Sequence, residues 1–177
     1  MPVQVKAVNS WTADQAASEL SRCCGARRWI SAMVARRPFK DAEDLYSASE
    51  QVWWSLDRED WLEAFSHHPK IGDRAGLARR LASTASWSKK EQEGVSGSSE
   101  EILSRLADGN IKYQEKFGYI FIVCASGKAA DEMLSILESR LDNAPGDELR
   151  IAAAEQIKIT RLRLEKLCQE ARSQATS

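Results

Sequence analysis

Apolar residues recur along most of the chain at intervals of three and four positions, the spacing of an amphipathic α-helix. Polar and charged residues fill the positions between them, so each segment has one apolar face and one polar face. The pattern predicts helices at about residues 13–24, 26–36, 41–56, 57–66, 89–95, 102–117, 128–141 and 147–171.

Local signals mark several of the predicted helix ends. Thr12 followed by Gln15 forms a capping box before the first of these helices, and Gly25 follows its last turn. Asp57 can cap the helix at residues 57–66 in the same way. Gly118 closes the helix that begins near residue 102. The predicted boundaries therefore follow from hydrogen-bonding residues as well as from periodicity.

The run from Tyr119 to Ala125 is continuously apolar and differs from this pattern. Its β-branched and aromatic residues would suit a buried strand, but no partner strand is evident. An extended, buried connector is the preferred interpretation, and its backbone amides must then find partners outside a sheet. The chain, residues 1–177, is predicted to be one all-α domain of seven or eight helices with its core at about residues 11–170.

Composition narrows the classes of partner. The 25 basic and 26 acidic side chains leave a net charge of −1, which does not favour nucleic acid. Uncharged runs such as Gly118–Gly127 are too short to span a membrane, and Met1–Lys6 has no signal-peptide core. We therefore expect a soluble protein of the cytoplasm or peroxisome that is not secreted and does not bind a membrane.

The four cysteines lie within apolar patterns and show no spacing typical of a disulfide framework or of a C-x-x-C motif. They are expected to be reduced core residues, at positions Cys23, Cys24, Cys124 and Cys168.

Both histidines of the chain, His67 and His68, stand side by side where the helix at residues 57–66 ends. Pro69 pushes His68 toward an extended backbone, so the two imidazoles should point in roughly opposite directions. One could face a pocket while the other faces water. Alternatively, a histidine at this position has only a structural role and hydrogen-bonds the last carbonyls of the helix. A metal site is disfavoured, because no further ligand lies at a familiar spacing.

Arg163 is a second candidate for chemistry. Ile159 and Leu167 flank it at helical spacing, which predicts an enclosed guanidinium that needs an anionic partner. Alternatively, its stem lies along apolar surface with the charged end in water. Arg161 faces Glu165 four residues later, the spacing of an ordinary surface pair.

A third candidate is Glu91, which completes a capping box with Ser88. A glutamate at this position often only bonds back to the start of its own helix. The same helix start also presents free N–H groups and positive potential, which can hold a ligand anion or carbonyl. In that case Ser88, Glu91 and Gln92 would act together.

Taken in order, these motifs resemble the 2-oxo-4-hydroxy-4-carboxy-5-ureidoimidazoline (OHCU) decarboxylases of uric acid degradation. The similarity extends from about Trp11 to Leu167. It rests on Cys23-Cys24-Gly25, Arg37-Pro38-Phe39, residues 60–65, His68-Pro69, Ile71-Gly72, Glu91-Gln92, Phe117-Gly118, residues 121–125, Glu155-Gln156, residues 158–160 and Arg163.

The resemblance implies a site. His68 matches the catalytic histidine before proline, Glu91 the second catalytic or orienting group, and Arg163 the substrate-binding arginine. The positions that match substrate-contacting segments are Pro69, Ser88, Gln92, Phe121, Ile122, Val123, Cys124 and Ala125.

The resemblance further implies an all-α homodimer that converts OHCU to (S)-allantoin without a metal or an organic cofactor. The substrate's own C5=N bond can accept the electrons released with CO₂, so the protein must only position groups and move protons.

Two other functions fit the same residues. The chain could be a non-catalytic helical module for binding a ligand or partner, or a hydrolase with a His/Glu pair, although no nucleophile motif supports hydrolysis. The presence of His68, Glu91 and Arg163 together favours the decarboxylase.

Overall fold

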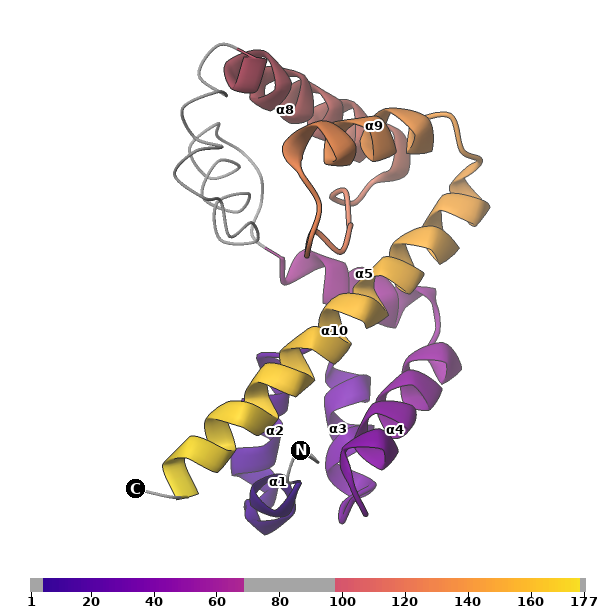
Figure 1. The fold of residues 1–177 in the computed structure, drawn as a ribbon. Helices are drawn as coiled ribbons and strands as arrows, with labels where there is room; N and C mark the ends of the chain where they lie inside the picture. Colours follow the sequence, from indigo (N-terminus) through magenta and orange to yellow (C-terminus); the bar gives the residue numbers. More distant parts are fainter. Residues whose placement is uncertain (1–4, 69–97, 176–177) are drawn as a thin grey trace. The chain divides into compact units, whose positions relative to one another are not determined.

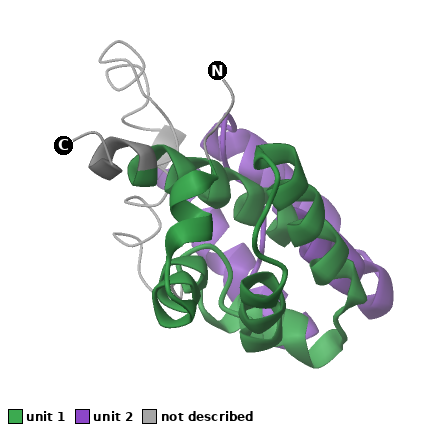
Figure 2. Ribbon diagram, turned by 90° about the horizontal axis from the view of Figure 1, so that it is seen from below, with its two compact units in different colours: residues 1–68, 156–177 green, residues 69–155 purple. Residues whose placement is uncertain are grey.

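The structure is a computed structural model that describes residues 5–68 and 98–175. All regular elements within these two ranges are α-helices, eight in number, which confirms the predicted all-α class. The chain divides into two compact units, Met1–His68 with Gln156–Ser177, and Pro69–Glu155 (Figure 2). The first is called unit 1 below and the second unit 2. Whether they form one domain stays a prediction.

Helix α3 is the centre of the N-terminal part of unit 1 and packs against α2, α4 and α5 (Figure 1). Trp29 and Met33 lie on its apolar face and are fully buried, as the helical spacing predicts. The helices of this unit are α1 (Lys6–Ser10), α2 (Ala13–Ser21), α3 (Arg27–Ala35), α4 (Ala42–Ser55), α5 (Arg58–Ser66) and the part of α10 (Pro145–Ala175) that follows Glu155.

The predicted caps are present. The N–H of Gln15 donates to Thr12 Oγ1 at 3.2 Å, and the N–H of Thr12 donates to Gln15 Oε1 at 3.0 Å. Asp57 and Asp60 form the same reciprocal pair at the start of α5. Each box satisfies backbone donors that the first helical turn leaves without partners.

Charged pairs fix α5 to α3. Arg28 Nη1 lies 2.8 Å from an oxygen of Asp60, which is buried, and Arg27 Nε lies 2.5 Å from Glu63 Oε1. The backbone N–H of Arg27 donates to the other oxygen of Glu63 at 3.0 Å. Because these contacts lie in the first and the middle turns of α5, they fix its position and therefore that of the histidines that follow it.

Unit 2 contains α8 (Ser98–Phe117), α9 (Ala130–Arg140) and the start of α10, and α8 packs against α9 (Figure 1). Gly118 ends α8 with a φ of +83°, a conformation that glycine adopts without strain. The segment after it is non-helical as far as residue 129, and Phe121, Ile122 and Val123 are buried. The predicted buried connector is thereby confirmed.

The backbone of the connector bonds to side chains, as predicted for a segment without a partner strand. Arg140 Nη1 donates to the carbonyl oxygen of Ile122 at 2.7 Å. The N–H of Cys124 donates to Glu155 Oε2, also at 2.7 Å. Buried backbone groups lose their hydrogen bonds to water, which costs free energy unless other partners replace the water. These two side-chain bonds provide such partners.

A buried ion pair organises unit 2. Arg140 Nη2 lies 2.5 Å from Glu148 Oε1, and the two side chains are 7% and 0% exposed. Glu148 also accepts from the hydroxyl of Tyr113 and, at 2.8 Å, from Asn143 Nδ2. The Arg140 guanidinium stacks 4.6 Å from the Phe121 ring centroid. One charged pair thus ties together α8, the connector, α9 and α10.

Some predicted boundaries shift. The last helix begins at Pro145 rather than at residue 147, because proline suits the first helical position, whose N–H needs no partner. The first capped helix ends at Ser21 rather than at Cys24. The predicted helix at residues 89–95 lies outside the described residues. None of the described helices is both long and apolar enough to cross a bilayer.

The buried pair yields a stability prediction. Glu148→Gln leaves the enclosed Arg140 without a counter-charge and should lower the free energy of unfolding by about 3 to 5 kcal/mol. Glu138→Gln is the matched control, because Glu138 pairs with Arg105 at 2.5 Å in the same unit but both side chains are half exposed. The control should cost less than about 1 kcal/mol. Urea denaturation measures both, and equal losses would contradict the assignment.

Candidate functional site

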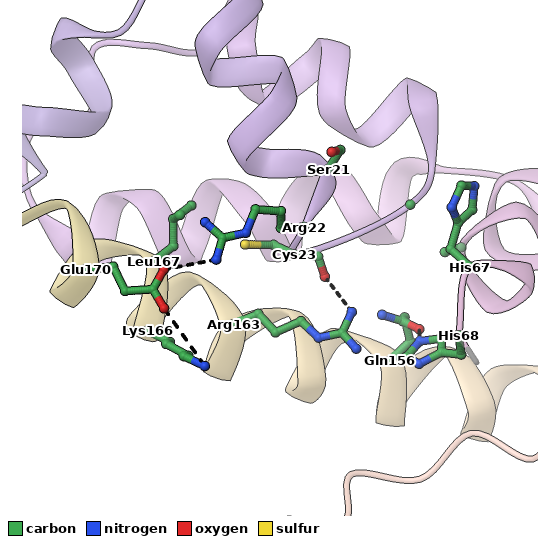
Figure 3. A pocket seen from close by; sticks show the side chains of 12 residues that line it. Ser21, Arg22, Cys23, His67, His68, Gln156, Arg163, Lys166, Leu167 and Glu170 are labelled. Carbon is green, nitrogen blue, oxygen red and sulfur yellow. Dashed lines mark hydrogen bonds and ion pairs between the residues drawn. The ribbon is translucent and has the colours of Figure 1, made fainter. Parts of the chain in front are cut away.

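A cavity of about 460 Å³ lies within unit 1 (Figure 3). It is formed by the segment after α2, the C-terminal end of α5 and the part of α10 in this unit. The residues of its wall that bear on function are Cys23, Gly25, His67, His68, Gln156 and Arg163.

His68 is placed by the end of α5. His67 is the C-cap residue of that helix, and the N–H of His68 donates to the carbonyl of Phe65 at 3.2 Å. His68 is 6% exposed, whereas His67 is exposed. Both line the cavity (Figure 3), so the expectation that one faces a pocket and the other only water is wrong. A tight helix end therefore presents two imidazoles in unlike surroundings.

Gly25 lies four residues after the end of α2, directly against His67. A Cβ atom at this position would overlap the ring of His67. Only glycine therefore lets the backbone after α2 lie directly against that imidazole. This close approach fixes the position of His67, and therefore the point at which the His68 side chain enters the interior of unit 1.

Gln156 is a site residue to which the sequence assigned no role. Its amide is buried, and Oε1 lies 2.5 Å from His68 Nε2. Its Nε2 donates to Thr160 Oγ1 at 3.2 Å, one turn further along α10. A buried amide, a buried hydroxyl and Arg163 at positions 156, 160 and 163 share one helix face, which is the signal that could have identified it.

The predicted enclosure of Arg163 is wrong. The side chain is exposed at the wall of the cavity, and Nη1 donates to the carbonyl of Cys23 at 3.4 Å. Within residues 5–68 and 98–171 it forms no ion pair. Its guanidinium is directed along α10 toward Gln156 and His68 (Figure 3). The apolar neighbours on its own helix did not reveal that a cavity opens beside it.

Arg161, by contrast, behaves as predicted. Its Nε lies 3.2 Å from Glu165 Oε1, and its guanidinium stacks 4.5 Å from the Tyr46 ring centroid. Arg161 is only two positions from Arg163, but it binds its partners on another side of α10 and does not line the cavity.

The cysteines near the cavity are poor nucleophiles at neutral pH. Burial raises the pKa of Cys23 and of Cys24 to about 12. At neutral pH the nucleophilic thiolate is therefore scarce. All four cysteines are buried and free of disulfides, as predicted. The chemistry available in the cavity is thus proton exchange at imidazole and binding of an anion or carbonyl by guanidinium.

The remaining predicted residues are not tested by this geometry. Pro69, Ser88, Glu91 and Gln92 lie outside the described residues. The segment at residues 121–125 belongs to unit 2, where its backbone has the partners given above. Among the described residues, no group of three or more His, Cys, Asp or Glu side chains could hold a metal ion.

Comparison with known sequences gives consistent matches. The model of the OHCU decarboxylase family matches residues 9–165, which include parts of both units. The chain is 40% identical over 152 residues to the uric acid degradation bifunctional protein TTL of Arabidopsis thaliana, covering 82% of this chain and 45% of that protein. It is 30% identical over 137 residues to the OHCU decarboxylase of Haloferax volcanii, covering 77% and 79%.

Comparison with solved structures agrees. The crystal structure of an OHCU decarboxylase in the presence of (S)-allantoin matches with a TM-score of 0.69 at 37% identity, covering 85% of this chain and 97% of that one. An (S)-allantoin synthase matches at 19% identity with a TM-score of 0.66, covering 93% and 54%, which supports the fold alone. With its helical fold and its matches in sequence and structure, this chain belongs to the OHCU decarboxylase family.

Proposed function

We propose that this protein decarboxylates 2-oxo-4-hydroxy-4-carboxy-5-ureidoimidazoline to (S)-allantoin. Family membership supports the reaction. The observation that carries it is the cavity in unit 1, which brings a buried imidazole, His68, and an exposed guanidinium without an ion pair in the described chain, Arg163, to one wall.

The reaction requires little beyond these groups. As the bond between C4 and the carboxylate breaks, CO₂ leaves and the electron pair forms a C4=C5 double bond. The C5=N nitrogen accepts the displaced electrons and takes up a proton. The C4 hydroxyl of this enol then loses its proton to form a carbonyl, and C5 gains a proton. Because delivery of this proton to one face of C5 produces one enantiomer, positioning and proton transfer are the protein's tasks.

Each residue would contribute by its chemistry. His68 would exchange a proton with the C4 hydroxyl region, since imidazole both takes and returns protons near neutral pH. Arg163 would hold an anionic or carbonyl group of the substrate with its planar donors. We further infer, from the family resemblance, that Glu91 with Ser88 and Gln92 grips the ureido and ring nitrogens. Pro69 and the backbone of residues 121–125 would complete the contacts.

The test of this function is to supply substrate freshly generated from uric acid. Its disappearance is followed by absorbance against its spontaneous decay, with a chelator present because no metal is required. The proposal expects a large acceleration and optically active allantoin. Decay at the spontaneous rate would instead support the alternative, a non-catalytic helical module that binds a ligand or partner.

Assembly and compartment stay predictions. The family resemblance supports a homodimer, which light scattering would detect. A location in the cytoplasm or peroxisome would suit a pathway enzyme.

The two histidines provide an internal comparison. His68→Asn should lower turnover at least about 100-fold, because removal of a general acid or base typically costs a factor of about 10² to 10⁴. His67→Asn loses the same ring at the same helix end and should stay within a few-fold of wild type. Steady-state kinetics would measure both. Equal losses, or an inactive His67→Asn protein, would place the catalytic histidine one residue away.

Arg163 and Arg161 provide a second comparison on one helix. Arg163→Lys replaces a planar fork with a point charge and should weaken (S)-allantoin binding by about 1 to 3 kcal/mol. Arg161→Lys makes the same change where the partners are Glu165 and Tyr46, outside the cavity, and should leave affinity unchanged. Calorimetry would measure both affinities. Wild-type affinity in Arg163→Lys would remove this residue from the site.

A further inference from the structure

The contact between His68 and Gln156 lies within unit 1 and involves only buried side chains. His68 Nε2 and Gln156 Oε1 are 2.5 Å apart, and the two residues are 6% and 1% exposed. At that distance the nitrogen and the oxygen must share a proton in a hydrogen bond. Since an amide oxygen only accepts, the proton must belong to the imidazole.

The other end of the amide determines which way Gln156 points. Its Nε2 donates to Thr160 Oγ1 at 3.2 Å, one turn further along α10. The two bonds form one directed row, in which His68 donates to Gln156 and Gln156 donates to Thr160. Within this row Gln156 accepts at Oε1 and donates at Nε2.

We propose that Gln156 is a positioning residue that holds neutral His68 in the tautomer protonated on Nε2, so that Nδ1 is the nitrogen that accepts a proton. The inference deepens the proposed function, because it specifies which atom of His68 takes part in proton exchange. A histidine's working nitrogen is set by the hydrogen bond that the other one makes.

A neutral amide is suited to this role. Its oxygen accepts from Nε2–H in both the neutral imidazole and the imidazolium, so the ring can gain and lose a proton at Nδ1 without breaking the bond. A carboxylate in the same place would favour the imidazolium and raise the pKa of the histidine. Gln156 therefore orients the ring without committing it to the charged form.

The direct test is nitrogen NMR of protein labelled with ¹⁵N-histidine. The chain has two histidines, and the His67→Asn variant assigns the signals of His68. At a pH above its titration, His68 should show a protonated Nε2 and an unprotonated Nδ1. A proton on Nδ1, or an even mixture of tautomers, would overturn the inference.

Two variants separate positioning from a structural role. Gln156→Met keeps the length but removes the acceptor, so the tautomer preference should be lost and kcat should fall about 10-fold to 100-fold with KM little changed. Gln156→Glu should keep the tautomer and move the acidic limb of the pH profile upward by about one unit, because the carboxylate stabilises the imidazolium.

Gln169→Glu is the control, because it adds the same charge on the exposed face of the same helix and should leave both readouts at wild type. A Gln156→Met protein with the wild-type tautomer and kcat would make Gln156 an ordinary core amide. The NMR measurement needs no turnover. Absence of decarboxylation with the expected tautomer would reject the proposed function alone, and the opposite tautomer in an active enzyme would reject this inference alone.

Discussion

The hydrogen bond between His68 and Gln156 joins two segments that lie 88 positions apart in the chain. On one side, α5 is fixed to α3 by Arg27 and Arg28. On the other, α10 presents the amide from a helix face that also carries Thr160 and Arg163. The bond therefore determines both where the imidazole lies and which of its nitrogens carries the proton. Without it, a histidine at a helix end would be only a capping residue.

The surroundings of this bond restrict the chemistry. Cys23 lines the same cavity, but burial raises its thiol pKa to about 12 and makes a nucleophilic role unfavourable. Arg163 presents its charge to the cavity because its one hydrogen bond within residues 5–68 and 98–171, to the Cys23 carbonyl, is long at 3.4 Å and does not compensate the charge. What remains is anion binding beside a proton-exchanging imidazole. A decarboxylation in which the substrate supplies its own electron sink needs little more.

Much of the fold could be predicted because its determinants are local. The Thr12 capping box, the positive φ of Gly118 and the buried connector follow from a few neighbouring residues. The exposure of Arg163 was mispredicted because the cavity beside it involves Cys23, 140 positions away. The sequence pattern assigned no role to Gln156 for the same reason, because its partner, His68, lies 88 positions away. Helix patterns reveal which face is apolar, but they do not reveal what approaches it.

We propose that the ligand binds where His68 and Arg163 line the cavity of unit 1. The most direct test is an NMR titration of ¹⁵N-histidine-labelled protein with (S)-allantoin, the compound present with the related OHCU decarboxylase. We expect saturable shifts of the His68 ring signals, with weaker shifts for (R)-allantoin. Binding that leaves the His68 signals unchanged while signals elsewhere in the protein shift would contradict it.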